Sequence, residues 1–113
     1  MRVERSDPDG VPHLAVFGEL DLGTVDPFKL RIELLEREQP ERIVIDLRGV
    51  TFMDSMALGI LVSHRLQAQQ AGRSFALVEP PRHIEDLFRL TGMQDQFEWV
   101  QAPASPARTR STG

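Results

Sequence analysis

The sequence predicts a single α/β domain with a mixed sheet of four or five strands and helices packed on it. Two observations support this fold class. Residues 42–47 form a short apolar run rich in β-branched side chains, as in a buried strand. Segments with strand character also alternate with segments of helical periodicity along the chain, in the order β-β-α-β-α-β-α-β. With 113 residues, 41% of them hydrophobic, the chain can build one core.

The first two predicted elements are strands joined by a turn. Residues 1–4 are expected to form a short edge strand. A turn follows at residues 7–10, where Pro8 restricts φ and Gly10 tolerates a positive φ. Residues 12–20 alternate in polarity, as expected for a half-buried strand, and His13 is interpreted as one of its solvated residues.

The first predicted helix covers residues 25–38. Thr24 or Asp26 is expected to cap it, and Pro27 falls in its first turn. Its apolar residues recur at helical spacing and predict the buried face: Val25, Phe28, Ile32 and Leu35. Its charged residues are interpreted as the solvated face: Glu33, Glu36, Arg37 and Glu38.

The central strand, residues 42–47, is followed by a second helix over about residues 55–71. Asp54 and Ser55 stand at its start, and both residue types cap helices, because a side-chain oxygen can accept a hydrogen bond from an unpartnered N–H. The Ser55 hydroxyl is therefore expected at a helix N-terminus. The expected core face of this helix consists of Ala57, Ile60, Leu61, His64, Ala68 and Ala71.

A second apolar ridge remains on this helix, formed by Leu58, Val62 and Leu66 at intervals of four residues. Ser55 projects along the same ridge at its N-terminal end. Contiguous exposed apolar area usually marks an interface, so the ridge is predicted to contact a partner. The alternative, that Leu58 and Val62 are covered by a neighbouring loop of the same chain, remains open.

The remaining elements complete a domain over residues 1–100. Gly72 is expected to end the second helix, and residues 74–79 predict a strand. A third helix starts at Pro80-Pro81 and ends at Gly92. Its expected buried face is Ile84, Leu87, Phe88 and Thr91. Residues 97–100 predict a last edge strand, and residues 101–113, without an apolar period, predict a disordered tail.

Composition excludes several classes of protein. The chain has no cysteine, so disulfides, thiolate metal sites and cysteine nucleophiles are absent. The net charge of −4, without a cluster of lysine and arginine, does not predict nucleic-acid binding. The polar start and the lack of a long apolar run argue against secretion and membrane insertion. A cytoplasmic protein that binds other proteins is expected, with no direct nucleic-acid or membrane contact.

Catalytic machinery is not predicted. Ser55, His64 and Asp54 do not fit a hydrolase triad, because His64 projects to the opposite side of the helix from Ser55. His64 also has no second ligand at metal-binding spacing. The phosphate-cradling, dinucleotide-binding and zinc-protease motifs are missing. The sequence therefore predicts no enzyme activity, no metal and no cofactor.

Two motifs stand in register along the chain. They are GELD, ending at Asp21, and the strand IVIDLRGVTFMDS, ending at Ser55 and followed by LG at Leu58-Gly59. Together they resemble the anti-sigma factor antagonists, the stand-alone members of the STAS domain family. The likeness covers nearly the whole chain as far as Val100, including LTGM near the end of the third helix. This chain departs from the usual D-S-S-G pattern, because Met56 and Ala57 replace the second serine and the glycine.

The resemblance implies a regulatory binding protein that switches partners. Ser55 would be phosphorylated by a serine kinase that is also an anti-sigma factor, and a serine phosphatase would reverse this. The expected partner surface consists of Asp21, Asp54, Ser55, Met56, Leu58, Val62 and Leu66. Whether the chain forms a homodimer is left open. Two rivals remain: an unphosphorylated STAS subunit of another assembly, such as a lipid-transport ATPase or a stress-signalling scaffold, and a small-ligand or nucleotide-binding domain.

Overall fold

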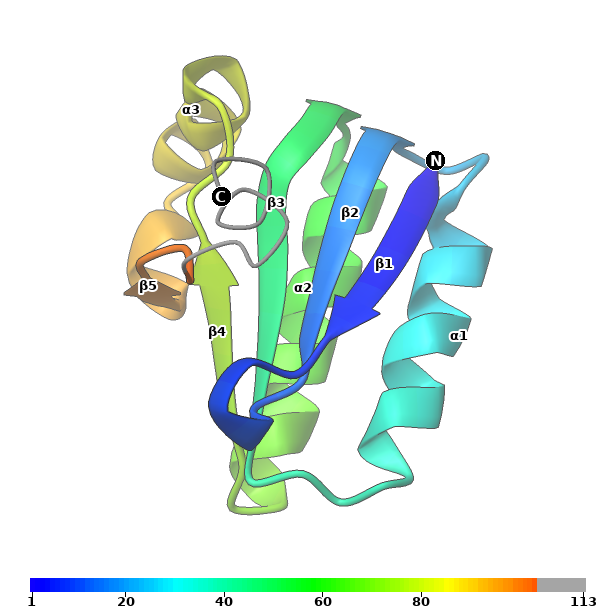
Figure 1. The fold of residues 1–113 in the computed structure, drawn as a ribbon. Coiled ribbons are helices and arrows are strands. Elements are labelled where there is room, and N and C mark those ends of the chain that lie inside the picture. The colour runs from blue at the N-terminus through cyan, green and yellow to red at the C-terminus, as the bar shows by residue number, and fades with distance from the viewer. Residues whose placement is uncertain (104–113) are drawn as a thin grey trace, which may run out of the picture.

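The computed structural model describes residues 1–103, which form one five-stranded sheet with three helices (Figure 1). The strands are β1 (Arg2–Ser6), β2 (His13–Leu20), β3 (Arg42–Met53), β4 (Ser74–Val78) and β5 (Glu98–Val100). They are arranged in the sheet in the order of the chain, β1-β2-β3-β4-β5. β1 and β2 are antiparallel, and the other three pairs are parallel. The predicted α/β class and element order are confirmed.

Each parallel pair is connected by a helix, as parallel strands require. The helices are α1 (Val25–Glu36), α2 (Ser55–Gln70) and α3 (Arg82–Leu90). In Figure 1, α2 lies behind the sheet, α1 packs beside α2 on the side of β1, and α3 lies on the side of β4 and β5. Gly72 and Gly92 follow α2 and α3, each with a φ of +73° that favours glycine, so both predicted helix ends are confirmed. No helix within residues 1–103 is long and apolar enough to cross a membrane.

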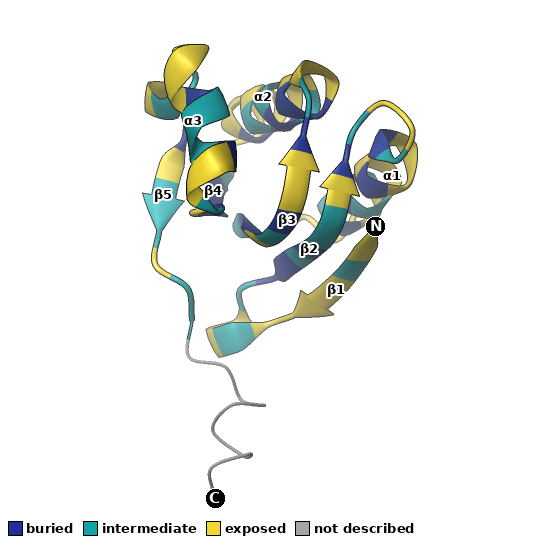
Figure 2. Cartoon of the chain, turned by 90° about the horizontal axis from the view of Figure 1, so that it is seen from above, coloured by how far each residue is buried: buried dark blue, intermediate teal, exposed yellow. Residues whose placement is uncertain are grey.

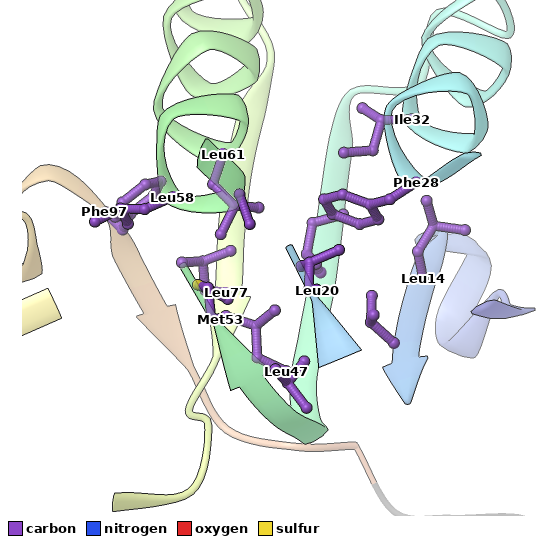
Figure 3. Close-up of a cluster of buried hydrophobic side chains, with 14 of the residues drawn as sticks. Leu14, Leu20, Phe28, Ile32, Leu47, Met53, Leu58, Leu61, Leu77 and Phe97 are labelled. Atoms are coloured by element: carbon purple, nitrogen blue, oxygen red, sulfur yellow. The ribbon is translucent and has the colours of Figure 1, made fainter. Parts of the chain in front are cut away.

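The main core lies between the sheet and the helices (Figure 3). The predicted face of α1 is confirmed, because Val25, Phe28, Ile32 and Leu35 are all buried. On α2, the predicted core positions Ala57, Leu61, His64 and Ala68 are buried, whereas Ile60 is half-buried and Ala71 is exposed beyond the end of the helix. On α3, Ile84 and Phe88 are buried, Leu87 is half-buried and Thr91 is exposed.

Several element boundaries differ from the prediction by a few residues, and three of the differences have a clear structural reason. β1 extends to Ser6 because it pairs with β2 as far as His13. β3 does not end at Leu47 but continues to Met53, since β2 pairs with it over that whole length and Leu20 lies opposite Met53. α1 ends at Glu36, before Gln39, which has a positive φ of 55°. Of the predicted tail, residues 104–113 lie outside the described residues.

Two polar side chains predicted to be solvated are buried or nearly so. His13 is 9% exposed, and its Nδ1 lies 2.9 Å from the Val11 carbonyl oxygen. The Glu36 side chain is only 14% exposed, because α1 packs beside α2 and brings Glu36 Oε1 to 3.4 Å from His64 Nδ1. The solvated interpretation of both residues is therefore wrong.

Candidate functional site

The junction between β3 and α2 is built around Asp54. β3 ends at Met53, Asp54 remains extended with φ −106° and ψ 179°, and Ser55 begins the helix. Asp54 Oδ1 accepts a hydrogen bond from the Ala57 N–H at 3.0 Å, which satisfies one of the free donors at the start of the helix. The predicted N-cap is thus confirmed at Asp54.

The second carboxylate oxygen of Asp54 connects α2 to another part of the chain. Asp54 Oδ2 accepts a hydrogen bond from the Leu22 N–H at 3.0 Å, across 32 positions of sequence. Leu22 belongs to the loop between β2 and α1. One aspartate therefore holds two adjacent connections of the sheet together, at the edge where parallel β2 and β3 both end (Figure 1).

The same loop contains Asp21, the last residue of GELD. Asp21 Oδ1 accepts a hydrogen bond from the Gly23 N–H at 2.9 Å, and the Thr24 hydroxyl donates to the Glu19 carbonyl at 2.9 Å. These bonds are local to the loop and shape it. Asp21 is thereby brought to the same edge as Asp54 through its neighbour Leu22, although its carboxylate is engaged inside its own loop.

Ser55 is exposed on the first turn of α2. The backbone N–H groups of Ser55 and Met56 lie in the first turn of α2, where N–H donors have no acceptor within the helix. The positive end of the helix dipole adds to this partial positive charge. Asp54 is the nearest carboxylate in sequence, so an anion attached to Ser55 would meet attraction from the helix end and repulsion from Asp54.

Three exposed apolar side chains come from the elements that meet at Ser55, and we call them the Ser55 rim. Leu22 lies in the loop after β2 and is 68% exposed, Phe52 is near the end of β3 and is 47% exposed, and Met56 follows Ser55 and is 47% exposed. The start of α3 approaches the same edge, where His83 Nε2 lies 2.8 Å from the Thr51 carbonyl oxygen. Exposed apolar side chains on the elements that adjoin an exposed hydroxyl are suited to a protein partner.

Leu22 and Phe52 were not among the residues predicted from the sequence. Each is an apolar residue adjacent or nearly adjacent to one of the predicted aspartates, Asp21 and Asp54. This closeness in sequence to the two aspartates is the signal by which Leu22 and Phe52 could have been predicted as site residues. Their exposure depends on the loop conformation and on the length of β3, which were not predicted.

The predicted ridge on α2 is not a continuous surface. Leu58 is 4% exposed and belongs to the core cluster that contains Phe97, beside which it lies in Figure 3. Val62 is half-buried and packs against the same cluster, and Leu66 is 44% exposed. The prediction that Leu58 contacts a partner is therefore wrong, because the segment after α3 covers that flank of α2.

His64 lies away from Ser55, inside the molecule. Its side chain is 1% exposed and faces Glu36 of α1. Among residues 1–103, no group of three or more histidine, aspartate and glutamate side chains is placed to hold a metal ion. The site thus consists of a hydroxyl, a capping carboxylate and apolar side chains, an arrangement suited to recognition.

Comparison with known proteins places the chain in a family. The chain is 31% identical over 102 residues to a protein from Paenibacillus polymyxa named anti-sigma F factor antagonist, with 84% of this chain and 87% of that protein covered. A crystal structure of an anti-sigma factor antagonist from Mycobacterium paratuberculosis superimposes with a TM-score of 0.80 at 26% identity, covering 99% of this chain and 94% of that one.

The anti-sigma factor antagonist SpoIIAA, solved in its unphosphorylated form, has the same fold. Its TM-score is 0.75 at 18% identity, over 99% of this chain and 97% of that chain. The family model described as STAS domain matches residues 2–106. The chain therefore belongs to the STAS domain family.

Proposed function

We propose that this chain is an anti-sigma factor antagonist that binds an anti-sigma factor with serine kinase activity and is released when that kinase phosphorylates Ser55. The observation that carries the proposal is the position of Ser55, exposed on the first turn of α2, with the exposed apolar side chains of the Ser55 rim on the elements that adjoin it. A kinase can reach such a hydroxyl without unfolding the helix. The names of the relatives support the antagonist role.

Phosphorylation at this position is expected to preserve the fold. A phosphoserine carries roughly −1.5 to −2 charges at pH 7. At Ser55 these charges would face free N–H donors and the positive end of the dipole of α2. The repulsion from Asp54 acts in the opposite direction, but Asp54 is itself held by two backbone N–H groups, those of Ala57 and Leu22.

Phosphorylation of Ser55 is expected to weaken partner binding, although it preserves the fold. If a partner covers the Ser55 rim, the phosphate must lose its water next to Asp54. An unpaired buried charge costs several kcal/mol, and roughly 1.4 kcal/mol already reduces affinity tenfold. The same modification therefore leaves the domain folded and releases the partner. A serine phosphatase would restore binding, and both reactions would take place in the cytoplasm.

In this proposal the chain itself is not an enzyme. It is the substrate of the kinase and the ligand that withdraws the anti-sigma factor from its sigma factor. The proposed contact set comprises Asp21, Asp54, Ser55, Met56, Val62 and Leu66, together with Leu22 and Phe52. Leu58 is omitted because it is buried.

The deciding experiment measures intact mass after incubation with ATP and each serine kinase encoded near the gene. Wild type should gain one phosphate and Ser55→Ala none. Ser63→Ala is the matched control, since Ser63 is another exposed serine on α2, and it should be modified like wild type. Phosphate on a different residue, or no phosphate from a kinase that binds the protein, would contradict the proposal.

One observation favours a second candidate function. Met56 is 47% exposed directly after Ser55 and adds a bulky, flexible side chain beside the hydroxyl. This environment also suits a STAS subunit that binds a partner through the same edge without phosphorylation, as in a transport or signalling assembly. Stable binding that ATP does not reverse would identify that function.

A further inference from the structure

The outer face of α1 carries a stripe that neither the core nor the Ser55 site uses. Leu30 is 52% exposed and Leu34 is 45% exposed, although both lie within a regular helix of twelve residues. Figure 2 shows exposed residues on the side of α1 that points away from the sheet. Two large aliphatic side chains four residues apart on one exposed helix face form a potential contact surface.

The stripe ends in opposite charges. At 100° per residue, Asp26, Leu30, Leu34 and Arg37 fall within about 80° of one another, opposite the buried face of the helix. Asp26 and Arg37 are both exposed, and neither makes a salt bridge within the part of the chain that the structure describes. The stripe is therefore acidic at the start, apolar in the middle and basic at the end.

We propose that this stripe, defined by Asp26, Leu30, Leu34 and Arg37, binds a second copy of the chain with the two α1 helices antiparallel. A two-fold axis on the exposed side of α1, level with residue 32 along the helix, places Leu30 of one copy opposite Leu34 of the other. The same axis places Asp26 of each copy opposite Arg37 of the other. The surface is thus complementary to itself in shape and in charge, as an interface of two-fold symmetry requires.

Charge selects this orientation over a parallel one. In a parallel pair, the two Asp26 carboxylates and the two Arg37 guanidinium groups would face each other, and like charges in contact are repulsive. A second copy of the chain is a better match for the stripe than a different protein, because the acidic and basic ends of the stripe pair with those of an antiparallel copy. Helix pairs of this size form weak, concentration-dependent dimers rather than permanent ones.

The dimer leaves the Ser55 site free. α1 starts next to the loop that bonds to Asp54, so antiparallel helices place the two Ser55 sites at opposite ends of the pair. Each copy can then engage its own partner. The dimer does not depend on phosphorylation, and its failure would leave the proposed function intact.

Cross-linking tests the register directly, because the chain has no native cysteine. Leu30→Cys and Leu34→Cys are prepared separately, one with an affinity tag, and oxidised alone or as a mixture. In the proposed dimer, position 30 of one copy meets position 34 of the other within disulfide distance. Two copies of the same position are instead offset by about 6 Å along the helix axis. The mixture should give severalfold more disulfide dimer than either variant alone. Equal yields in all three reactions would overturn the antiparallel register.

Sedimentation of the full chain over a range of concentrations tests the surface itself. Leu30→Glu and Arg37→Asp should each weaken self-association at least tenfold, and Asp26→Arg combined with Arg37→Asp should restore it. Leu90→Glu, at an 82% exposed leucine on α3, is the control and should behave as wild type. A monomer at all concentrations up to the millimolar range, or no rescue in the double variant when circular dichroism shows it folded, would refute the proposal.

Discussion

Asp54 and Leu22 are joined by a hydrogen bond of 3.0 Å, from the Leu22 N–H to Asp54 Oδ2, and this bond connects two loops that are 32 residues apart. The other oxygen of Asp54 caps α2 at the Ala57 N–H. The conformation of the loop that presents Leu22 and the start of the helix that presents Ser55 therefore depend on a single carboxylate. This carboxylate thus connects the loop that follows GELD to the junction between β3 and α2.

Replacing Asp54 with alanine should destabilise the domain by about 1 to 2 kcal/mol, since the helix loses its cap. Urea unfolding measures the loss. The exposed Asp95→Ala variant is the control and should change stability by less than about 0.5 kcal/mol. Faster amide hydrogen exchange at Leu22 in Asp54→Ala would show that the loop has been released. Unchanged exchange there would contradict the coupling.

Ser55→Asp should unfold at nearly the wild-type urea concentration but bind the anti-sigma kinase at least tenfold more weakly, because the carboxylate adds an unpaired charge beside Asp54. Ser55→Ala should bind and should not be released by ATP. Calorimetric titration with and without ATP distinguishes the two. Equal affinity of Ser55→Asp and wild type would favour the unphosphorylated assembly subunit.

Leu58 and Leu66 are expected to respond in opposite ways, although the sequence places them on one ridge. Leu58→Ala should cost about 2 to 5 kcal/mol, because it leaves a cavity beside Phe97. Leu66→Ser should change stability by less than about 0.5 kcal/mol and weaken partner binding. Urea unfolding measures the stability of both variants, and titration with the partner measures their affinity. Together they show which of the two leucines belongs to the core and which to the contact surface. A severe loss of stability in Leu66→Ser would remove it from the proposed contact set.

Phe52→Ser should weaken partner binding severalfold with little effect on stability, since its side chain is 47% exposed in the Ser55 rim. Leu90→Ser is the control, because Leu90 is exposed on α3 and belongs to no proposed contact with the kinase. Titration with the kinase measures both. Equal binding by Phe52→Ser and wild type would place the interface elsewhere.

Glu98 should make stability depend on acid pH. The Arg42 guanidinium, 2.7 Å away, and the Ser74 hydroxyl lower the pKa of Glu98 below its ordinary value of 4.5. A lowered pKa in the folded state stabilises the fold above pH 4.5, and this contribution is lost as the pH falls through the folded pKa. Because the pair is partly exposed, its contribution is under about 1 kcal/mol.

Unfolding of Glu98→Gln at several pH values tests this expectation. The variant should be less stable than wild type at pH 7, and the difference should shrink as the pH falls below 4.5. A constant difference across the acid range would show that the effect comes from packing at β5 and has no electrostatic origin.

Much of the fold could be predicted because its signals are local. The buried face of α1 follows from the spacing of Val25, Phe28, Ile32 and Leu35, since a helix turns by a constant angle per residue. The cap at Asp54 follows from a residue type that bonds three positions ahead. The Ser55 position was likewise predictable, because it depends only on where a strand ends and a helix begins.

The sequence by itself thus determined the order of elements, the cap at Asp54 and the position of Ser55 at the start of a helix, which all depend on neighbours a few residues apart. Only the tertiary structure decided what covers each surface. Phe97, far along the chain, buries Leu58, and α1 brings Glu36 next to His64. The bond between Asp54 and Leu22 also needs β2 and β3 to end at the same edge. The spacing of residues along a helix or strand determines the face on which a side chain lies. Whether that side chain is buried depends on which distant segments of the chain pack against that face.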